Sequence, residues 1–278
     1  MYKGRKLLIA TKHQKEKVIA DKFEVHFGVK CFIEPTYDTD QLGTFTGEIE
    51  RTLSPIETLR AKCLQAMNTY GYDLGIASEG SFGPHPAIFM IPADEELMLF
   101  MDKKNNVEIV VKQISTKTNF AGKRINNLDA LDQFIQQVKF PSHGVILRKD
   151  RDSNENIIKD IHDHASLNAA FTKLMNLYGT VFIETDMRAM NNPTRMSVIE
   201  ETTLKLIHAI DSKCPECKTP GFLPIKFIPG LPCGFCGLPT KSIKVEIIGC
   251  KKCGFEQEVN FPKNKKIEDP QYCDYCNP

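Results

Sequence analysis

The sequence predicts a mixed-sheet α/β domain followed by a small cysteine-rich zinc-ribbon module. Strand-like and helix-like segments alternate over residues 1–212, which is the pattern of an α/β fold. Eight of the ten cysteines fall in residues 213–278, where they form four Cys-x-x-Cys pairs. No internal repeat or low-complexity linker separates the two regions, so we expect the module to pack on the main domain.

The elements of the main domain follow from short apolar runs and from apolar faces at helical spacing. The predicted strands are residues 6–11, 29–35, 73–79, 96–102, 107–115, 144–148 and 180–185. The predicted helices are residues 14–27, 54–70, 128–138, 166–178 and a last one after Pro193. The strands on either side of "KKNN" are expected to pair as an antiparallel hairpin.

The helix at residues 54–70 carries its own start and stop signals. Ser54 is the predicted N-cap, Pro55 takes the first helical position, and Glu57 takes the capping-box position. Gly71 is expected to end the helix.

The stretch "IASEGSFGPHP", residues 76–86, is predicted to present a carboxylate at the rim of the sheet. An apolar strand ends in Glu79, and two glycines and two prolines then favour a stiff turn. The alternative is a tight loop in which Glu79 only caps a neighbouring group.

The cysteine pairs predict two structural zinc ions, each held by four thiolates. Neighbouring pairs are the simplest combination, and interleaved pairs are the alternative. With neighbouring pairs, the sites are Cys214, Cys217, Cys233 and Cys236, and Cys250, Cys253, Cys273 and Cys276. The segments on either side of "CKKC" are predicted to form a β-hairpin with this knuckle at its tip.

The charge of the module makes it a weak candidate for binding a phosphate backbone. Residues 213–278 contain ten lysines, seven acids and no arginine. Eight thiolates and two zinc ions turn this balance slightly negative. A nucleic-acid site needs clustered basic residues, so we expect at most a local patch here.

Basic residues follow the first predicted strand in "ATKHQKEK". Lys12, His13, Lys15 and Lys17 lie where a helix begins, and the helix dipole disfavours cations there. A bound phosphate would reverse this cost, whereas a solvated basic turn is the alternative.

An acidic loop, "DTDQLGTFTGEIER", supplies candidates for Mg²⁺ or Mn²⁺. Such ions take oxygen ligands, often one or two carboxylates together with substrate phosphates. The candidate ligands are Asp38, Asp40, Glu48, Glu57 and Glu79. An ordinary hydrophilic connection is the alternative for the loop.

Two arginines bracket a turn before the last helix, in "ETDMRAMNNPTRM". Arg188 and Arg195 could hold phosphate or a base edge with a planar guanidinium. An Asp186–Arg188 pair that only holds the helix start is the alternative.

The motifs "ATKHQKE", "IASEGSFGPHP", "GLPCGFCG" and "YCDYCNP" resemble a bacterial family of unknown function with a double zinc ribbon, over essentially the whole chain. Residues 1–212 more distantly resemble nucleoside triphosphate pyrophosphatases of the inosine-triphosphatase and Maf type. That resemblance rests on "ATKHQKE", "SPIETLRAKCLQAM", "DLGIASEGSF" and the late arginine turn. It implies a three-layer α/β fold for residues 1–212 and leaves the zinc module, residues 213–278, unexplained.

The second resemblance also implies roles for individual residues. Thr11, Lys12, His13, Lys15 and Lys62 would bind phosphates. Glu57 would bind Mg²⁺, and Glu79 would be a metal ligand or the base. Arg188 and Arg195 would hold the base or the phosphates. His13 stands where the enzymes have asparagine, and Glu79 where the inosine-triphosphatase branch has aspartate.

These features predict a metal-dependent hydrolase that cleaves a nucleotide phosphoanhydride, with Glu79, Glu57 and His85 as candidate catalytic residues. The alternative is a non-catalytic factor whose α/β domain binds a nucleotide and whose zinc ribbons bind a protein or RNA partner. The alternative predicts ligand binding without turnover and a salt-dependent affinity for nucleic acid. An inert scaffold predicts neither.

Overall fold

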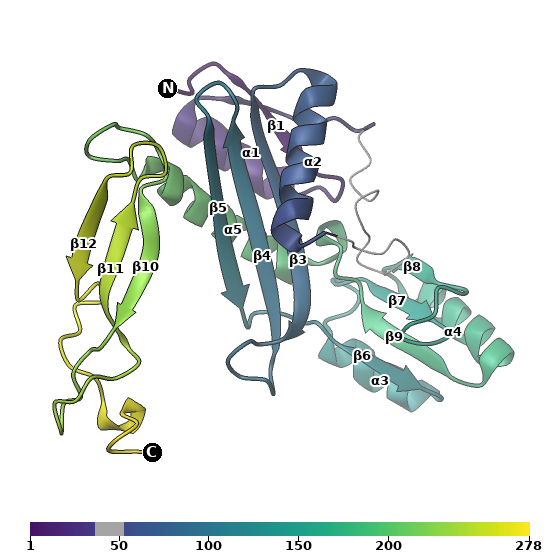
Figure 1. Cartoon of the computed structure of the whole chain (residues 1–278). Coiled ribbons are helices and arrows are strands. Elements are labelled where there is room, and N and C mark those ends of the chain that lie inside the picture. Colours follow the sequence, from purple (N-terminus) through teal and green to yellow (C-terminus); the bar gives the residue numbers. More distant parts are fainter. Residues whose placement is uncertain (37–52) are drawn as a thin grey trace. The chain divides into compact units, whose positions relative to one another are not determined.

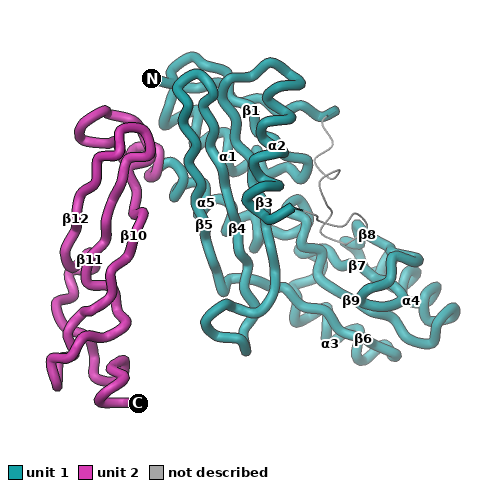
Figure 2. Tube along the Cα trace, in the orientation of Figure 1, with its two compact units in different colours: residues 1–207 teal, residues 208–278 magenta. Residues whose placement is uncertain are grey.

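The computed structural model describes residues 1–36 and 53–278, which form two compact units, Met1–Ile207 and His208–Pro278 (Figures 1 and 2). The described residues form a mixed α/β structure with five α-helices. Three candidate metal ligands, Asp38, Asp40 and Glu48, lie outside the described residues. In the part of the chain that is described, none of the helices combines the length and apolar composition needed to cross a bilayer.

Unit 1 contains two sheets rather than one. Sheet A has five strands in the order β2-β1-β3-β4-β5, parallel among β2, β1 and β3 and antiparallel among β3, β4 and β5. Its strands are β1 (Lys6–Ala10), β2 (Lys30–Phe32), β3 (Leu74–Pro84), β4 (Pro92–Asp102) and β5 (Val107–Ser115). The hairpin predicted across "KKNN" is confirmed as β4 and β5.

Strand β3 is longer than the sequence predicts, because it does not end at Glu79. It continues to Pro84, and every residue from Leu74 to Pro84 pairs with β4. The chain reverses only at residues 85–91. The glycines of "SEGSFGP" therefore lie within a strand, where pairing with β4 overrides their weak strand propensity.

Helices cover both faces of sheet A (Figure 1). Helix α2 (Pro55–Tyr70) packs on one face through a core that includes Leu59, Cys63 and Met67. Its start is as predicted, because Ser54 and Glu57 form a capping box and Gly71 ends it in a left-handed conformation. Helices α1 (Glu16–Phe27) and α5 (Pro193–Asp211) pack on the other face.

Sheet B has four antiparallel strands in the order β6-β9-β7-β8. Its strands are β6 (Gly122–Ile125), β7 (Val145–Arg148), β8 (Ile158–Ile161) and β9 (Val181–Thr185). Helices α3 (Leu128–Gln137) and α4 (His164–Tyr178) share an apolar core with it. The sequence predicts one mixed sheet because short apolar runs carry no information on which strands pair.

Unit 2 is built on a three-stranded antiparallel sheet. Its strands are β10 (Leu223–Pro229), β11 (Ile243–Gly249) and β12 (Glu256–Asn260), in that order across the sheet. Strands β11 and β12 form the predicted hairpin, with Cys250–Cys253 at its tip. Most strand residues are exposed or half-buried, so this unit has little apolar core of its own.

Candidate functional site

The candidate site lies where β1 ends beside β3. The last residue of β1, Ala10, pairs with Ala77 of β3. Beyond Ala77, β4 is the strand that β3 pairs with in the described part of the chain. Consecutive side chains of a strand point to opposite faces, so groups from both faces of sheet A can approach this edge of β3 at Ser78 and Glu79, which are both buried.

Lys15 reaches this edge from the residue before α1. Its side chain is buried, and its Nζ donates to the Ser78 hydroxyl at 3.0 Å and to the Ser78 carbonyl at 3.3 Å. Burial, reinforced by the positive charge of Arg195, lowers the pKa of Lys15 to about 8. The site therefore holds a lysine whose charge would be stabilised by an anion.

Lys62 and Glu79 form a buried ion pair on the α2 face of the sheet. Lys62 belongs to α2 and Glu79 to β3, so the pair joins a helix to the strand that it covers. Removing one partner of such a pair leaves an uncompensated buried charge. The structure thus brings together two of the residues that the sequence singles out.

Arg195 lies in the first turn of α5, on the other face of β3 and β4. Its Nε donates to Glu96 Oε1 at 2.7 Å and its Nη1 to the Met187 carbonyl at 2.5 Å. The guanidinium also lies 4.9 Å from the centre of the Phe82 ring. Gly80 makes room for this pair, because a Cβ there would overlap both the guanidinium and Glu96 Oε1.

Asp94 lies on the same face as Glu96, opposite Phe82 in the register of β3 and β4. Its exposed fraction is 0% and that of Glu96 is 1%. Within the described residues, neither carboxylate oxygen of Asp94 has a hydrogen-bond partner, nor does Oε2 of Glu96. Burial, with repulsion from Glu96, raises the pKa of Asp94 to about 8.

Sequence reasoning missed Asp94 and Glu96. The signal is present in "PADEELMLFMD", where Asp94, Glu96, Met98 and Phe100 alternate along one strand face. Two acids that continue a buried apolar face need a partner or a ligand. The strand predicted from residue 96 starts too late to reveal this alternation.

Among the remaining phosphate candidates, Thr11 has a buried hydroxyl without a hydrogen-bond partner at the end of β1. Lys12 is exposed and His13 half-buried in the turn that follows. Their assignment to phosphate stays a prediction.

Glu57 and His85 are engaged in local structure. Glu57 is exposed and accepts from the Ser54 N–H at 2.9 Å, and hydrogen bonds from Ser54 lower its pKa. His85 Nδ1 accepts from the N–H groups of Ala87 and Ile88 at 3.2 Å each, which closes the turn after β3. Catalytic or metal roles for both residues stay predictions.

Arg188 pairs with acids of its own region. Its Nη2 donates to Asp186 at 2.6 Å and to Asp160 at 2.8 Å, and Asn191 donates to the same two carboxylates. Asp186 is fully buried. This network has the form of the alternative predicted from the sequence, in which an Asp–Arg pair only holds the start of a helix.

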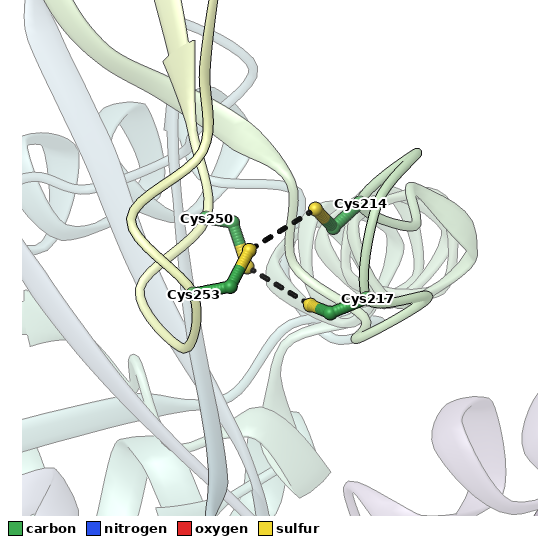
Figure 3. Close-up of side chains that lie close together, drawn as sticks. All are labelled: Cys214, Cys217, Cys250 and Cys253. Carbon is green, nitrogen blue, oxygen red and sulfur yellow. Dashed lines mark hydrogen bonds between the residues drawn. The ribbon is translucent and has the colours of Figure 1, made fainter.

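Unit 2 brings its eight cysteines into two four-sulfur clusters, and their pairing is interleaved rather than between neighbours. The first cluster combines Cys214 and Cys217 with Cys250 and Cys253, and its sulfurs point toward one another (Figure 3). The second combines Cys233, Cys236, Cys273 and Cys276. The sheet explains this arrangement. Cys233 and Cys236 follow β10 at one end of the sheet. Strand β11 then returns the chain to the other end, where Cys250 and Cys253 meet Cys214 and Cys217.

Both clusters fit zinc. The closest sulfur pairs are 3.5 and 3.6 Å apart in the first cluster and 3.7 and 3.9 Å apart in the second. Zn–S bonds of about 2.3 Å in a tetrahedron place the sulfurs about 3.8 Å apart, whereas a disulfide needs about 2.05 Å. All eight cysteines are free. The two clusters are therefore positioned to bind one zinc ion each.

Comparison with known proteins gives a family but no activity. The model of a domain of unknown function (DUF6671) matches residues 62–278. No curated protein matches the chain. The match begins in α2 at Lys62 and includes β3, β4, α5 and both cysteine clusters, but leaves out Thr11 and Lys15.

Proposed function

The chain belongs to the family described as a domain of unknown function, DUF6671, and we propose that it is a metal-dependent hydrolase acting on a nucleotide phosphoanhydride. In this proposal, residues 1–212 form the nucleotide-binding domain and residues 213–278 the zinc-ribbon module. The covering of sheet A by helices on both faces supports a three-layer fold like that of the inosine-triphosphatase and Maf enzymes.

One observation carries the proposal: three buried cations lie around the same part of β3. Lys15 contacts Ser78, Lys62 pairs with Glu79, and Arg195 packs against the position of Gly80. Buried lysines and arginines need anionic partners, and phosphates accept several such charge-assisted hydrogen bonds. The buried Thr11 hydroxyl at the end of β1 adds a donor without a hydrogen-bond partner at the same edge.

The reaction follows from these groups. Water attacks a phosphorus atom, the P–O bond to the neighbouring phosphate breaks, and the products are a nucleoside monophosphate, pyrophosphate and a proton. Bound Mg²⁺ or Mn²⁺ would neutralise phosphate charge and polarise the attacked phosphate. Glu79 would take the proton from water, and its ion-pair partner Lys62 would hold the carboxylate in position. Lys15 and Arg195 would stabilise the charge on the phosphate oxygens.

The test is release of pyrophosphate and phosphate by the zinc-loaded full chain across normal and damaged nucleoside triphosphates, with Mg²⁺, with Mn²⁺ and without either. We expect metal-dependent release that Glu79→Gln abolishes. Glu95→Gln is the matched control, because Glu95 is the neighbour of Glu96 and forms a half-exposed pair with Lys112. No release from any nucleotide, or full release by folded Glu79→Gln, would contradict the proposal.

A second candidate function rests on the different knuckles of the two cysteine clusters. The third residues of the knuckles are Glu216 and Lys252 in the first cluster, but Phe235 and Tyr275 in the second. These aromatic side chains are 82% and 74% exposed. Exposed aromatic residues stack on the bases of single-stranded nucleic acid and are also enriched in protein interfaces.

This candidate is tested by the binding of single-stranded RNA and DNA oligonucleotides to the zinc-loaded chain. Aromatic stacking predicts that Phe235→Ala with Tyr275→Ala weakens binding, whereas Glu216→Ala with Lys252→Ala leaves it unchanged. Binding that falls with salt but ignores the aromatic residues would assign affinity to the lysines instead. No binding at low salt would remove the nucleic-acid role.

A further inference from the structure

We infer that Asp94 and Glu96 together bind a divalent cation of the Mg²⁺ or Mn²⁺ type. The inference deepens the proposed function and rests on it for the identity of the anion that shares the cation. It names metal ligands on β4, outside the acids that the sequence singles out, and leaves Glu79 as the base.

The first argument is geometry. Asp94 and Glu96 are two residues apart on one strand, so both side chains leave the same face of sheet A, about 6.6–7 Å apart along the strand. Their positions oppose Phe82 and Gly80 of β3. Gly80 carries no side chain, and the Arg195 guanidinium and Glu96 Oε1 take up the space that a Cβ would need there.

The second argument is the hydrogen-bond inventory. Three of the four carboxylate oxygens, both of Asp94 and Oε2 of Glu96, are buried and have no hydrogen-bond partner among residues 1–36 and 53–278. The guanidinium of Arg195 donates to Glu96 Oε1 and to the Met187 carbonyl, so these two hydrogen bonds satisfy none of the three oxygens. Buried polar atoms are nearly always paired, so three adjacent exceptions indicate a missing ligand.

A proton on Asp94 does not remove this requirement. The protonated carboxyl group would donate one hydrogen bond, yet in the described part of the chain neither oxygen has a hydrogen-bond partner. It would also leave Glu96 Oε2 without a donor. A cation can satisfy oxygens of both residues together, and carboxylate oxygens are the ligands that Mg²⁺ and Mn²⁺ prefer.

The ligand set also predicts how the cation is held. In the described residues, the groups of three or more potential ligands are the two cysteine clusters, so Asp94 and Glu96 act as a pair. Mg²⁺ commonly takes one or two carboxylates and completes its coordination with water and substrate phosphates. We therefore expect weak binding of the cation alone and tighter binding when a phosphate anion shares it.

Charge leads to the same expectation. Lys15, Lys62 and Arg195 balance Glu79, Glu96 and an ionised Asp94 in number. A bound dication would leave an excess of positive charge at this buried edge. An anion with several phosphate charges would offset that excess, which is the class of substrate that the proposed reaction requires.

The experiment measures Mn²⁺ binding to the zinc-loaded full chain from the electron paramagnetic resonance signal of free Mn²⁺, with and without imidodiphosphate. We expect one Mn²⁺ per chain, bound more tightly with imidodiphosphate. Asp94→Asn and Glu96→Gln, which preserve side-chain size, should each weaken binding by at least about tenfold. Glu95→Gln should bind as the unaltered chain does.

Three results would overturn the inference: no Mn²⁺ bound with imidodiphosphate present, unchanged binding in both Asp94→Asn and Glu96→Gln, or loss only in Glu79→Gln. Circular dichroism identifies the variants that fold. If only one of Asp94→Asn and Glu96→Gln folds, that variant alone is enough for the test. The two proposals fail separately. Mn²⁺ binding lost in Asp94→Asn without any nucleotide turnover would retain the metal site and reject the hydrolase, and turnover with normal Mn²⁺ binding in Asp94→Asn and Glu96→Gln would do the reverse.

Discussion

Two buried carboxylate–arginine networks in unit 1 differ in how completely their hydrogen bonds are made. After β9, Asp186 accepts hydrogen bonds on both oxygens, from Arg188 and Asn191. On β4, Arg195 donates to one oxygen of Glu96, and the remaining oxygens of Glu96 and Asp94 have no hydrogen-bond partner in the part of the chain that the structure describes. Both carboxylate groups are removed from water, so the difference lies in their partners rather than in burial.

This difference separates a structural network from a binding site. A satisfied network offsets its own desolvation and holds the chain in one conformation. An unsatisfied one costs stability until a ligand completes it. Arg188 and Arg195 look equivalent in the sequence, but only Arg195 lies in the incomplete network.

The largest expected effect is on the satisfied network. Asp186→Ala should lower the free energy of unfolding by about 3–5 kcal/mol, because it leaves Arg188 and Asn191 without their buried partner. Hydrogen exchange of the sheet B amides measures this loss. Asp150→Ala removes the exposed Arg124–Asp150 pair and should cost about 0–1 kcal/mol. Equal losses of stability in the two variants would contradict the distinction between a buried, fully hydrogen-bonded network and an exposed ion pair.

A smaller effect is expected where Arg195 packs against Gly80. In Gly80→Ala the new methyl group overlaps the guanidinium and Glu96, so the pair must move, at about 1–3 kcal/mol. Gly83→Ala, in the same strand with open space at its Cβ position, should change stability by less than about 0.5 kcal/mol. Thermal unfolding compares the two. A Gly80→Ala protein as stable as Gly83→Ala would show that the pair is loosely held.

An effect of opposite sign, a gain in stability, is expected for Asp94→Asn. Because the folded chain raises the pKa of Asp94 to about 8 from an ordinary 3.8, the unfolded chain loses this proton at lower pH. Asp94 therefore costs increasing stability as pH rises from about 4 to about 8. Without added Mg²⁺ or Mn²⁺, Asp94→Asn should gain relative to the unaltered chain over this range. Urea unfolding at several pH values tests this, and a pH-independent difference would contradict it.

The residues that sequence reasoning located are those with local signals. Ser54, Glu57 and Gly71 define the ends of α2 through contacts within a few residues of one another. The eight cysteines indicate zinc because the Cys-x-x-Cys spacing within each knuckle is itself typical of zinc ligands. Which knuckles share a metal depends on the course of β10 and β11, and no local pattern contains that information.

The candidate site shows the same limit. Lys62 and Glu79 are suggested by resemblance to enzymes, and the structure brings them together across α2 and β3. Sequence reasoning does not find Asp94 and Glu96, because their burial depends on contacts with α5 and on the length of β3. The extension of β3 past Glu79 depends on pairing with β4, which overrides the turn signals of glycine and proline.

The interleaving of the cysteine clusters makes unit 2 indivisible. A cut in the chain anywhere between Cys217 and Cys273 separates the halves of at least one cluster, and a cut between Cys236 and Cys250 separates both. If neighbouring knuckles shared each metal, unit 2 would consist of two separate metal-binding segments, and each could be lost, duplicated or exchanged without the other. Here a protease that cuts between Cys217 and Cys273 places the two halves of at least one cluster on separate fragments, and recombination within this range separates them in the same way.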